Sequence, residues 1–133
     1  MVPVQSLQET LADKLIALVY RAKRIKPRDI WDIVWIKQRG IRLSKALLEQ
    51  KLAARQKPNE DFRQALTVQL AKIMSEDEVR NDFNMEMSRF IPAQIKERTL
   101  DNPEYWVYIQ AEVNDIAAEL LNNDKPKNRF DMG

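Results

Sequence analysis

The sequence lacks both cysteine and histidine. Without cysteine there is no disulfide framework, no thiolate nucleophile and no Cys-ligated zinc or iron–sulfur cluster. Without histidine there is no His-based catalytic triad, no HExxH zinc site and no imidazole to act as a general base near neutral pH. These two absences exclude several large classes of hydrolase and metalloenzyme.

Glycine and long apolar runs are also scarce. The chain has 2 glycines against 6 prolines, which disfavours an all-β fold because tight hairpins need residues that accept positive φ. No apolar run approaches the roughly 20 residues that cross a bilayer. The first five residues have neither the basic nor the apolar segment of a signal peptide. We therefore expect a cytoplasmic protein without a membrane partner.

The charge is distributed unevenly along the 133 residues. Residues 1–57 carry 13 Lys/Arg and 5 Asp/Glu, whereas residues 58–133 carry 9 Lys/Arg and 15 Asp/Glu. A basic half can attract phosphates of nucleotides or nucleic acids. Alternatively, the basic and acidic halves attract each other within the fold. Composition leaves both interpretations open.

Six helical segments can be read from hydrophobic spacing and from residues that start helices. The expected start signals are a capping box at Ser6, Pro27 in a first turn, Ser44, Asn59 as a cap, a second capping box at Ser75, and Asn102–Pro103. We expect the first helix to continue to about Arg21 and the second to about Arg39, where Gly40 stops it.

The expected fold is all-α, a compact bundle of about six helices. Residues 1–122 are expected to form a single helical domain, and residues 123–133 a flexible C-terminal tail. Apolar residues at helical spacing predict the core, which includes Leu15, Leu18, Trp31, Phe62, Leu66, Phe83 and Trp106. On the second helix, Trp35 is also expected to face inward.

Charged residues on the first two helices form the most informative pattern. Lys14 and Arg21 are seven residues apart, so they lie at nearly the same azimuth. On the second helix, Asp29 and Asp32 share one face, and Asp29 lies in the first turn, where the helix dipole favours an anion. In one interpretation, Arg28 and Asp32 form an ordinary intrahelical ion pair. In the other, Lys14 and Arg21 meet a polyphosphate while Asp29 orients Lys14 or helps to hold a cation. Spacing alone does not decide between them.

Three further patterns have ordinary structural explanations. Trp106, between Tyr105 and Tyr108, fits the core better than a base-stacking surface. The acidic run 76–78 lies in a first helical turn, which favours a capping role over a metal site. Residues 27–55 have the outline of a helix-turn-helix, but the modest basic character of its second helix disfavours DNA binding.

The spacing of these charges is that of a known motif. The segment Leu11–Leu18, which contains Lys14, followed by Arg21 and the run Arg28-Asp29-x-x-Asp32, resembles the Lys…Arg…Arg-Asp-x-x-Asp motif of the AbiEii/AbiGii nucleotidyltransferase-like toxins. These toxins belong to bacterial abortive-infection and type IV toxin–antitoxin systems. The match covers about thirty residues, and the helical remainder is compatible with the family's variable C-terminal region.

The resemblance implies a function and roles for these residues. It implies binding of an NTP with Mg²⁺ and transfer of a nucleotide to RNA, with tRNA as the suggested acceptor. Lys14 and Asp29 would have catalytic roles. Lys14, Arg21 and Arg28 would contact the nucleotide phosphates, and Asp32 with Asp29 would orient the cations.

The sequence departs from the family in one respect. The family's N-terminal half supplies a Gly/Ser-rich turn and an Asp-x-Asp pair that hold the catalytic metal, and nothing here corresponds to them, so no metal ligand is assigned. Metal ions clamp the attacking and leaving oxygens in such transfers. We therefore expect this chain to resemble the C-terminal half of such a toxin without its catalytic sheet and to be inactive alone, which leaves open whether it is an enzyme.

Several partners follow from this expectation. They are an upstream nucleotidyltransferase half, an antitoxin protein, RNA, and a second copy of the chain, because a missing half would leave apolar surface exposed. The alternative is a non-catalytic helical interaction module that binds a partner protein or RNA.

Overall fold

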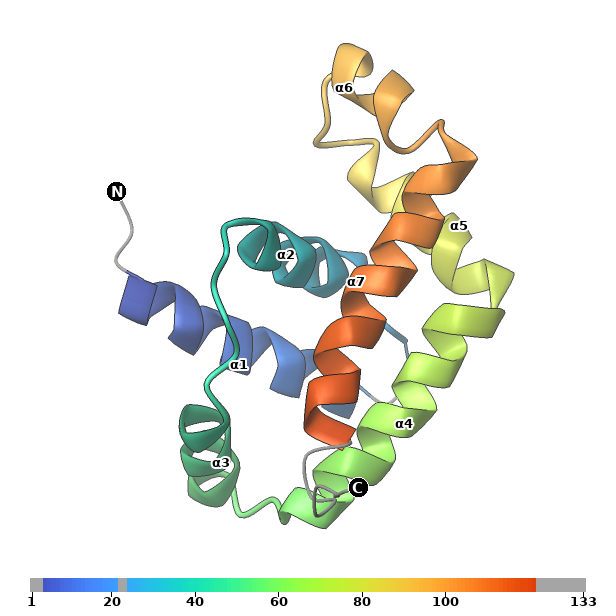
Figure 1. Cartoon of the computed structure of the whole chain (residues 1–133). Coiled ribbons are helices and arrows are strands. Elements are labelled where there is room, and N and C mark those ends of the chain that lie inside the picture. The colour runs from blue at the N-terminus through green and yellow to red at the C-terminus, as the bar shows by residue number, and fades with distance from the viewer. Residues whose placement is uncertain (1–3, 22–23, 122–133) are drawn as a thin grey trace, which may run out of the picture.

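The computed structural model describes residues 4–21 and 24–121. These ranges form seven α-helices and no strand (Figure 1), which confirms the predicted all-α class. The helices are α1 Val4–Tyr20, α2 Pro27–Gln38, α3 Lys45–Ala54, α4 Asn59–Ser75, α5 Asp77–Met87, α6 Ala93–Arg98 and α7 Pro103–Leu121. The predicted tail, residues 123–133, lies outside the described residues.

Helix α2 occupies the centre of the arrangement, where it packs against α1, α5 and α7. Helices α4 and α7 run side by side (Figure 1), and α1 packs against α4 and α3. The short helix α6 lies at the opposite end of the molecule from α3. None of the described helices is both long and apolar enough to span a membrane.

The core contains most of the residues that hydrophobic spacing predicted. Phe83 is fully buried, and its ring centroid lies 6.4 Å from that of Trp31 and 5.3 Å from that of Trp106. Trp31 is only partly buried against this core. The other predicted core residues are all buried, namely Leu15, Leu18, Phe62, Leu66 and Trp106. Because aromatic side chains bury large areas, this cluster joins α2, α5 and α7.

The prediction that Trp35 faces inward is wrong. Its side chain is 38% exposed, and the guanidinium of Arg39 lies 4.5 Å from its ring centroid. The buried aliphatic positions of α2 are Ile30, Ile33, Val34 and Ile36. Trp35 therefore faces solvent. In the sequence it belongs to the apolar run 33–36, so hydrophobic spacing alone did not show which of these residues face inward.

Three of the predicted helix starts are confirmed. Pro27 is the first residue of α2. The Ser44 hydroxyl accepts a hydrogen bond from the Leu47 N–H at 3.2 Å and caps α3. The Asn102 side-chain oxygen accepts one from the Glu104 N–H at 3.0 Å at the start of α7. The Ser44 and Asn102 side chains each satisfy an N–H that the helix leaves unpaired.

The two predicted capping boxes are wrong, and the Asn59 cap is displaced by one residue. Ser6 lies inside α1, and Ser75 is the last residue of α4, where its hydroxyl donates to the Ala71 carbonyl at 2.7 Å. Asn59 is the first residue of α4, and Pro58 occupies the cap position. Serine hydroxyls bond equally well to a carbonyl one turn earlier, so the Ser-x-x-Glu pattern alone does not fix a helix start.

Helix α6 was not predicted. It has six residues and no buried side chain, so it presents no hydrophobic period to recognise.

Phe83→Ala is expected to lower the free energy of unfolding by about 3–5 kcal/mol, because it removes a buried ring and leaves a cavity between Trp31 and Trp106. Met85→Ala, on the same helix but 62% exposed, is the control and should change stability by less than about 0.5 kcal/mol. Urea denaturation followed by tryptophan fluorescence measures both. Equal effects for the two variants would contradict the described core.

Candidate functional site

Helix α1 supplies the two cations of the candidate site. Its apolar stripe, Leu11, Leu15 and Leu18, is buried. Lys14 leaves α1 at the edge of this stripe, and Arg21 follows the last residue of the helix. Both side chains keep solvent contact, with 32% and 43% of their surface exposed. Long cationic side chains at such edges bury their stems and keep their charged ends accessible.

Helix α2 supplies the two carboxylates. Pro27 begins the helix, so Asp29 lies in its first turn, where unpaired N–H groups and the helix dipole favour a negative charge. The Asp29 side chain is only 1% exposed, whereas that of Asp32, one turn later, is 28% exposed. A carboxylate buried to this degree needs cationic or hydrogen-bonding partners to remain charged.

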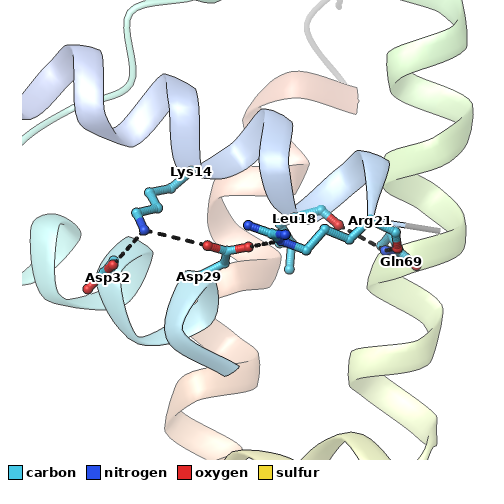
Figure 2. A network of polar contacts seen from close by, with 6 residues as sticks. All are labelled: Lys14, Leu18, Arg21, Asp29, Asp32 and Gln69. Carbon is cyan, nitrogen blue, oxygen red and sulfur yellow. Dashed lines mark hydrogen bonds and ion pairs between the residues drawn. The ribbon is translucent and has the colours of Figure 1, made fainter. Parts of the chain in front are cut away.

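The structure brings these four side chains together between α1 and α2. Figure 2 shows Lys14 pointing toward both carboxylates, with its Nζ 2.9 Å from Asp32 Oδ2 and 3.6 Å from Asp29 Oδ1. Arg21 approaches Asp29 from the other side, and its Nε donates a 2.8 Å hydrogen bond to Oδ2. Asp29 therefore binds both cations of α1 at once.

Arg28, the fifth residue of the motif, lies apart from this network. The proposed intrahelical pair with Asp32 is not formed in the described part of the chain, because Asp32 binds Lys14 instead. The Arg28 guanidinium lies 5.0 Å from the ring centroid of Phe90, and its Nε is buried without a hydrogen-bond partner among the described residues. Arg28 thus contacts the segment that follows α5 and takes no part in the network between α1 and α2.

The carboxylates stabilise the charged form of Lys14. Its pKa is raised above the ordinary value of 10.5, mainly by the hydrogen bond to Asp32. Partial burial opposes this effect, and the negative charges of Asp32 and Asp29 add to it. Lys14 is therefore a cation at physiological pH, and the two cations and two anions of the network balance.

A surface hollow lies beside the network. It has a volume of about 200 Å³ and is lined by Arg21, Arg24, Lys26 and Glu86. Arg24 forms ion pairs with Asp82 at 3.2 Å and Glu86 at 3.7 Å, so part of its charge is compensated. The hollow gives an anion a route to Arg21 from solvent.

Gln69 holds the end of α1 and was not predicted. Its side chain is buried on α4, and its Nε2 donates to the Leu18 carbonyl at 2.8 Å and to the Arg21 carbonyl at 3.2 Å (Figure 2). The Leu18 carbonyl belongs to the last turn of α1 and the Arg21 carbonyl directly follows it, and the helix provides no partner for either. The available signal was a polar residue at a core position, since Gln69 lies between Leu66 and Ile73 on one helical stripe.

Ion pairs join the basic and acidic halves of the chain, as one interpretation of the charge asymmetry predicted. Lys37 Nζ lies 2.7 Å from Glu112 Oε1 and 3.6 Å from Asp115 Oδ2. The Lys37 contact, helped by a hydrogen bond from Tyr108, lowers the pKa of Glu112 below its ordinary value. With the pairs of Arg24, these contacts connect α2 and its preceding loop to α7 and α5.

The remaining candidates have structural roles. Trp106 is buried, which confirms the core interpretation. The acidic run 76–78 contains the cap residue and first turn of α5. In the ranges that the structure describes, no group of three or more acidic side chains could hold a metal ion.

Asp29→Asn is expected to lower the free energy of unfolding by about 1–3 kcal/mol. The substitution removes the buried charge that binds Arg21 and Lys14, and partial exposure of both cations limits the loss. Asp82→Asn breaks the more exposed pair with Arg24 and should cost less than about 1 kcal/mol. Chemical denaturation measures both variants, and an equal loss would contradict a special role for Asp29.

The pH dependence of stability should report on Lys14. Because its pKa is raised in the fold, its ion pairs contribute fully below the ordinary value of 10.5 and are lost as the pH rises through the raised value. Lys14→Arg keeps a charge throughout this range. The stability difference between variant and wild type should be constant from about pH 7 to 10 and then move in favour of the variant. Parallel profiles at all pH values, measured by urea denaturation, would contradict this.

Comparison with known proteins identifies the family. The family model described as nucleotidyl transferase AbiEii toxin, type IV TA system, matches residues 1–118. Comparison with curated proteins gives no match, and neither does comparison with solved structures. The matched segment covers the whole network between α1 and α2 and all but the last residues of α7, and it confirms the resemblance that the motif indicated. The chain belongs to the AbiEii nucleotidyl transferase toxin family of type IV toxin–antitoxin systems.

Proposed function

We propose that this chain is the C-terminal helical part of an AbiEii-type toxin and binds the phosphates of an NTP for nucleotide transfer to RNA, with tRNA as the acceptor. Family membership supports the reaction class. The observation that carries the proposal is the double contact of Asp29, which fixes Lys14 and Arg21 in one arrangement while leaving both cations partly exposed.

In this proposal the role of each charged residue follows from how far its side chain is exposed to solvent. Lys14 and Arg21 contact the triphosphate, since accessible cations held in place recognise phosphate oxygens well. Asp29 has almost no solvent contact, so its part in catalysis is to position both cations. Asp32 orients Lys14 through the 2.9 Å contact. Arg28 adds positive charge from its position beside Phe90.

The Mg²⁺ of nucleotidyl transfer is bound by carboxylates that are free to coordinate it. Asp29 and Asp32 are engaged by Lys14 and Arg21, and no other acidic group among the described residues has the required clustering. We propose that the metal ligands for nucleotidyl transfer lie outside the described residues, on an upstream nucleotidyltransferase half. The chain alone would then bind a nucleotide without transferring it. A cytoplasmic location and an antitoxin partner are part of the same proposal, as is self-association.

A second candidate function is a non-catalytic interaction module. The charge balance of the network favours it, because a set of two cations and two anions is also a complete interhelical clamp. The two functions differ in one measurable respect. A clamp needs no nucleotide, whereas the proposed function requires nucleotide affinity that depends on Lys14.

Nucleotide titration separates the two functions. The chain is expected to bind at least one of ATP, GTP, CTP or UTP with Mg²⁺ in isothermal titration calorimetry. Lys14→Gln and Arg21→Gln should each weaken that binding by about 10-fold or more, because each removes a charge-assisted contact. Affinity should not change through a lysine titration between about pH 7.5 and 9.5, since the pKa of Lys14 is raised.

Lys37→Gln is the matched control. Lys37 is also a partly buried lysine that pairs with two carboxylates of a neighbouring helix, and its pKa is likewise raised. Its loss should alter stability to a similar extent without changing nucleotide affinity. Absence of binding to all four nucleotides, or an equal loss in Lys37→Gln, would reject the proposed function in favour of the interaction module.

A further inference from the structure

One face of α2 carries a stripe of charged and aromatic side chains, partly buried in its first half and exposed in its second. Arg28, Asp32, Trp35 and Arg39 follow one another at the spacing of a single helix face, which continues past the last residue of α2. The face adjoins α1 at Asp32, which binds Lys14. The candidate site uses Asp32, and the proposed function also draws on the charge of Arg28. The second half, Trp35 and Arg39, has no role in the proposed nucleotide site.

Trp35 and Arg39 form a layered pair at the surface. The guanidinium lies 4.5 Å from the indole centroid, and the indole keeps 38% of its surface exposed. Such contacts hold the flat guanidinium against the ring. Unpaired bases stack on aromatic rings and equally on arginine planes. The pair therefore offers two surfaces of the kind that bases use.

The positive charge at this end of α2 is not compensated locally. Neither Arg39 nor Arg42 forms an ion pair with a described residue, whereas Lys14, Arg21 and Lys37 all do. The Arg42 carbonyl accepts a hydrogen bond from Gln8 Nε2 at 3.2 Å, which holds this connection against α1. An uncompensated positive surface favours a polyanion over a neutral partner.

The position of the pair relative to Lys14 suggests what this polyanion is. Trp35 lies one helical turn after Asp32, the carboxylate that binds Lys14, which is about 5 Å along the helix axis. A strand stacked on Trp35 thus lies within a few nucleotides' reach of the proposed phosphate site. An acidic protein segment would use the two arginines but would gain nothing from the ring and guanidinium layer.

We propose that Trp35, Arg39 and Arg42 form a binding surface for single-stranded nucleic acid. The inference rests on the proposed function in one respect, that this strand is the acceptor of the nucleotide. One base stacks on the Trp35–Arg39 layer, and Arg39 and Arg42 contact backbone phosphates on either side.

The test measures binding of labelled ten-nucleotide single-stranded RNA and DNA to the full chain by fluorescence anisotropy, without nucleotide. Trp35→Leu should weaken binding by about fivefold or more, and Trp35→Phe should restore most of it. Arg39→Gln and Arg42→Gln should each weaken binding. Each should also reduce the slope of log affinity against log salt concentration by somewhat less than one unit, because one phosphate contact is lost. Wild-type tryptophan fluorescence should be quenched on binding, and this quenching should be smaller in Trp35→Phe.

Two matched controls separate stacking at this surface from general charge. Lys57 lies 4.8 Å from the Tyr20 ring centroid, so Lys57→Gln removes another cation–aromatic pair. Arg98→Gln removes an exposed arginine on α6. Both should bind the strands like wild type.

Several outcomes would overturn the inference. They are no binding of either strand, equal binding of duplex RNA, or equal losses in the control variants. Binding only to an acidic peptide of matched charge would also reject it. Failure of the proposed function gives a different result, because a chain that binds the strand but no NTP retains this surface and loses its link to nucleotide transfer. A chain that binds an NTP but neither strand retains the proposed nucleotide site and rejects the strand-binding surface.

Discussion

The carboxylate of Asp29 lies almost without solvent between the packed helices α1 and α2. A charge in this position is unfavourable unless cations and donors surround it, because it has lost its hydration. Its first-turn location on α2 supplies part of this environment, and Arg21 and Lys14 of α1 supply the rest. The need to compensate one buried charge therefore fixes how α1 and α2 lie against each other.

The ends of the helices are completed by side chains from their neighbours. Gln69 of α4 donates to carbonyls in the last turn of α1, and Gln110 of α7 donates to the Ile73 carbonyl near the end of α4 at 2.9 Å. These hydrogen bonds satisfy groups that a helix cannot satisfy itself. They also connect α1 to α4 and α4 to α7, so the position of Arg21 depends on a chain of contacts that reaches the far side of the bundle.

Much of the site could be predicted from spacing, because helix geometry alone places Lys14 and Arg21 on one face and Asp29 and Asp32 on another. Spacing did not reveal which partner each charge would choose. Asp32 had a cation one turn away in its own helix, yet it binds Lys14 across the interface. That choice depends on how α1 and α2 pack.

The same limit explains the errors elsewhere in the fold. Trp35 lies in a run of apolar residues, and packing decides which of them face inward. Ser75 fits a capping pattern, but its hydroxyl donates to a carbonyl in the preceding turn. Gln69 belonged to a core stripe that was read only for its apolar members. Tertiary packing decided the positions of Trp35 and Gln69, whereas a competing local hydrogen bond decided that of Ser75.

The ion pairs at the two ends of α2 have a mechanical consequence. Asp29 fastens the beginning of the helix to α1, and Lys37 fastens its last turn to α7. A rotation of α2 about its own axis by a single residue, about 100°, would break both sets of contacts at once and turn Trp35 toward the core. The ion pairs therefore oppose rotation of α2 about its axis, and they transmit a force on its exposed face to both α1 and α7.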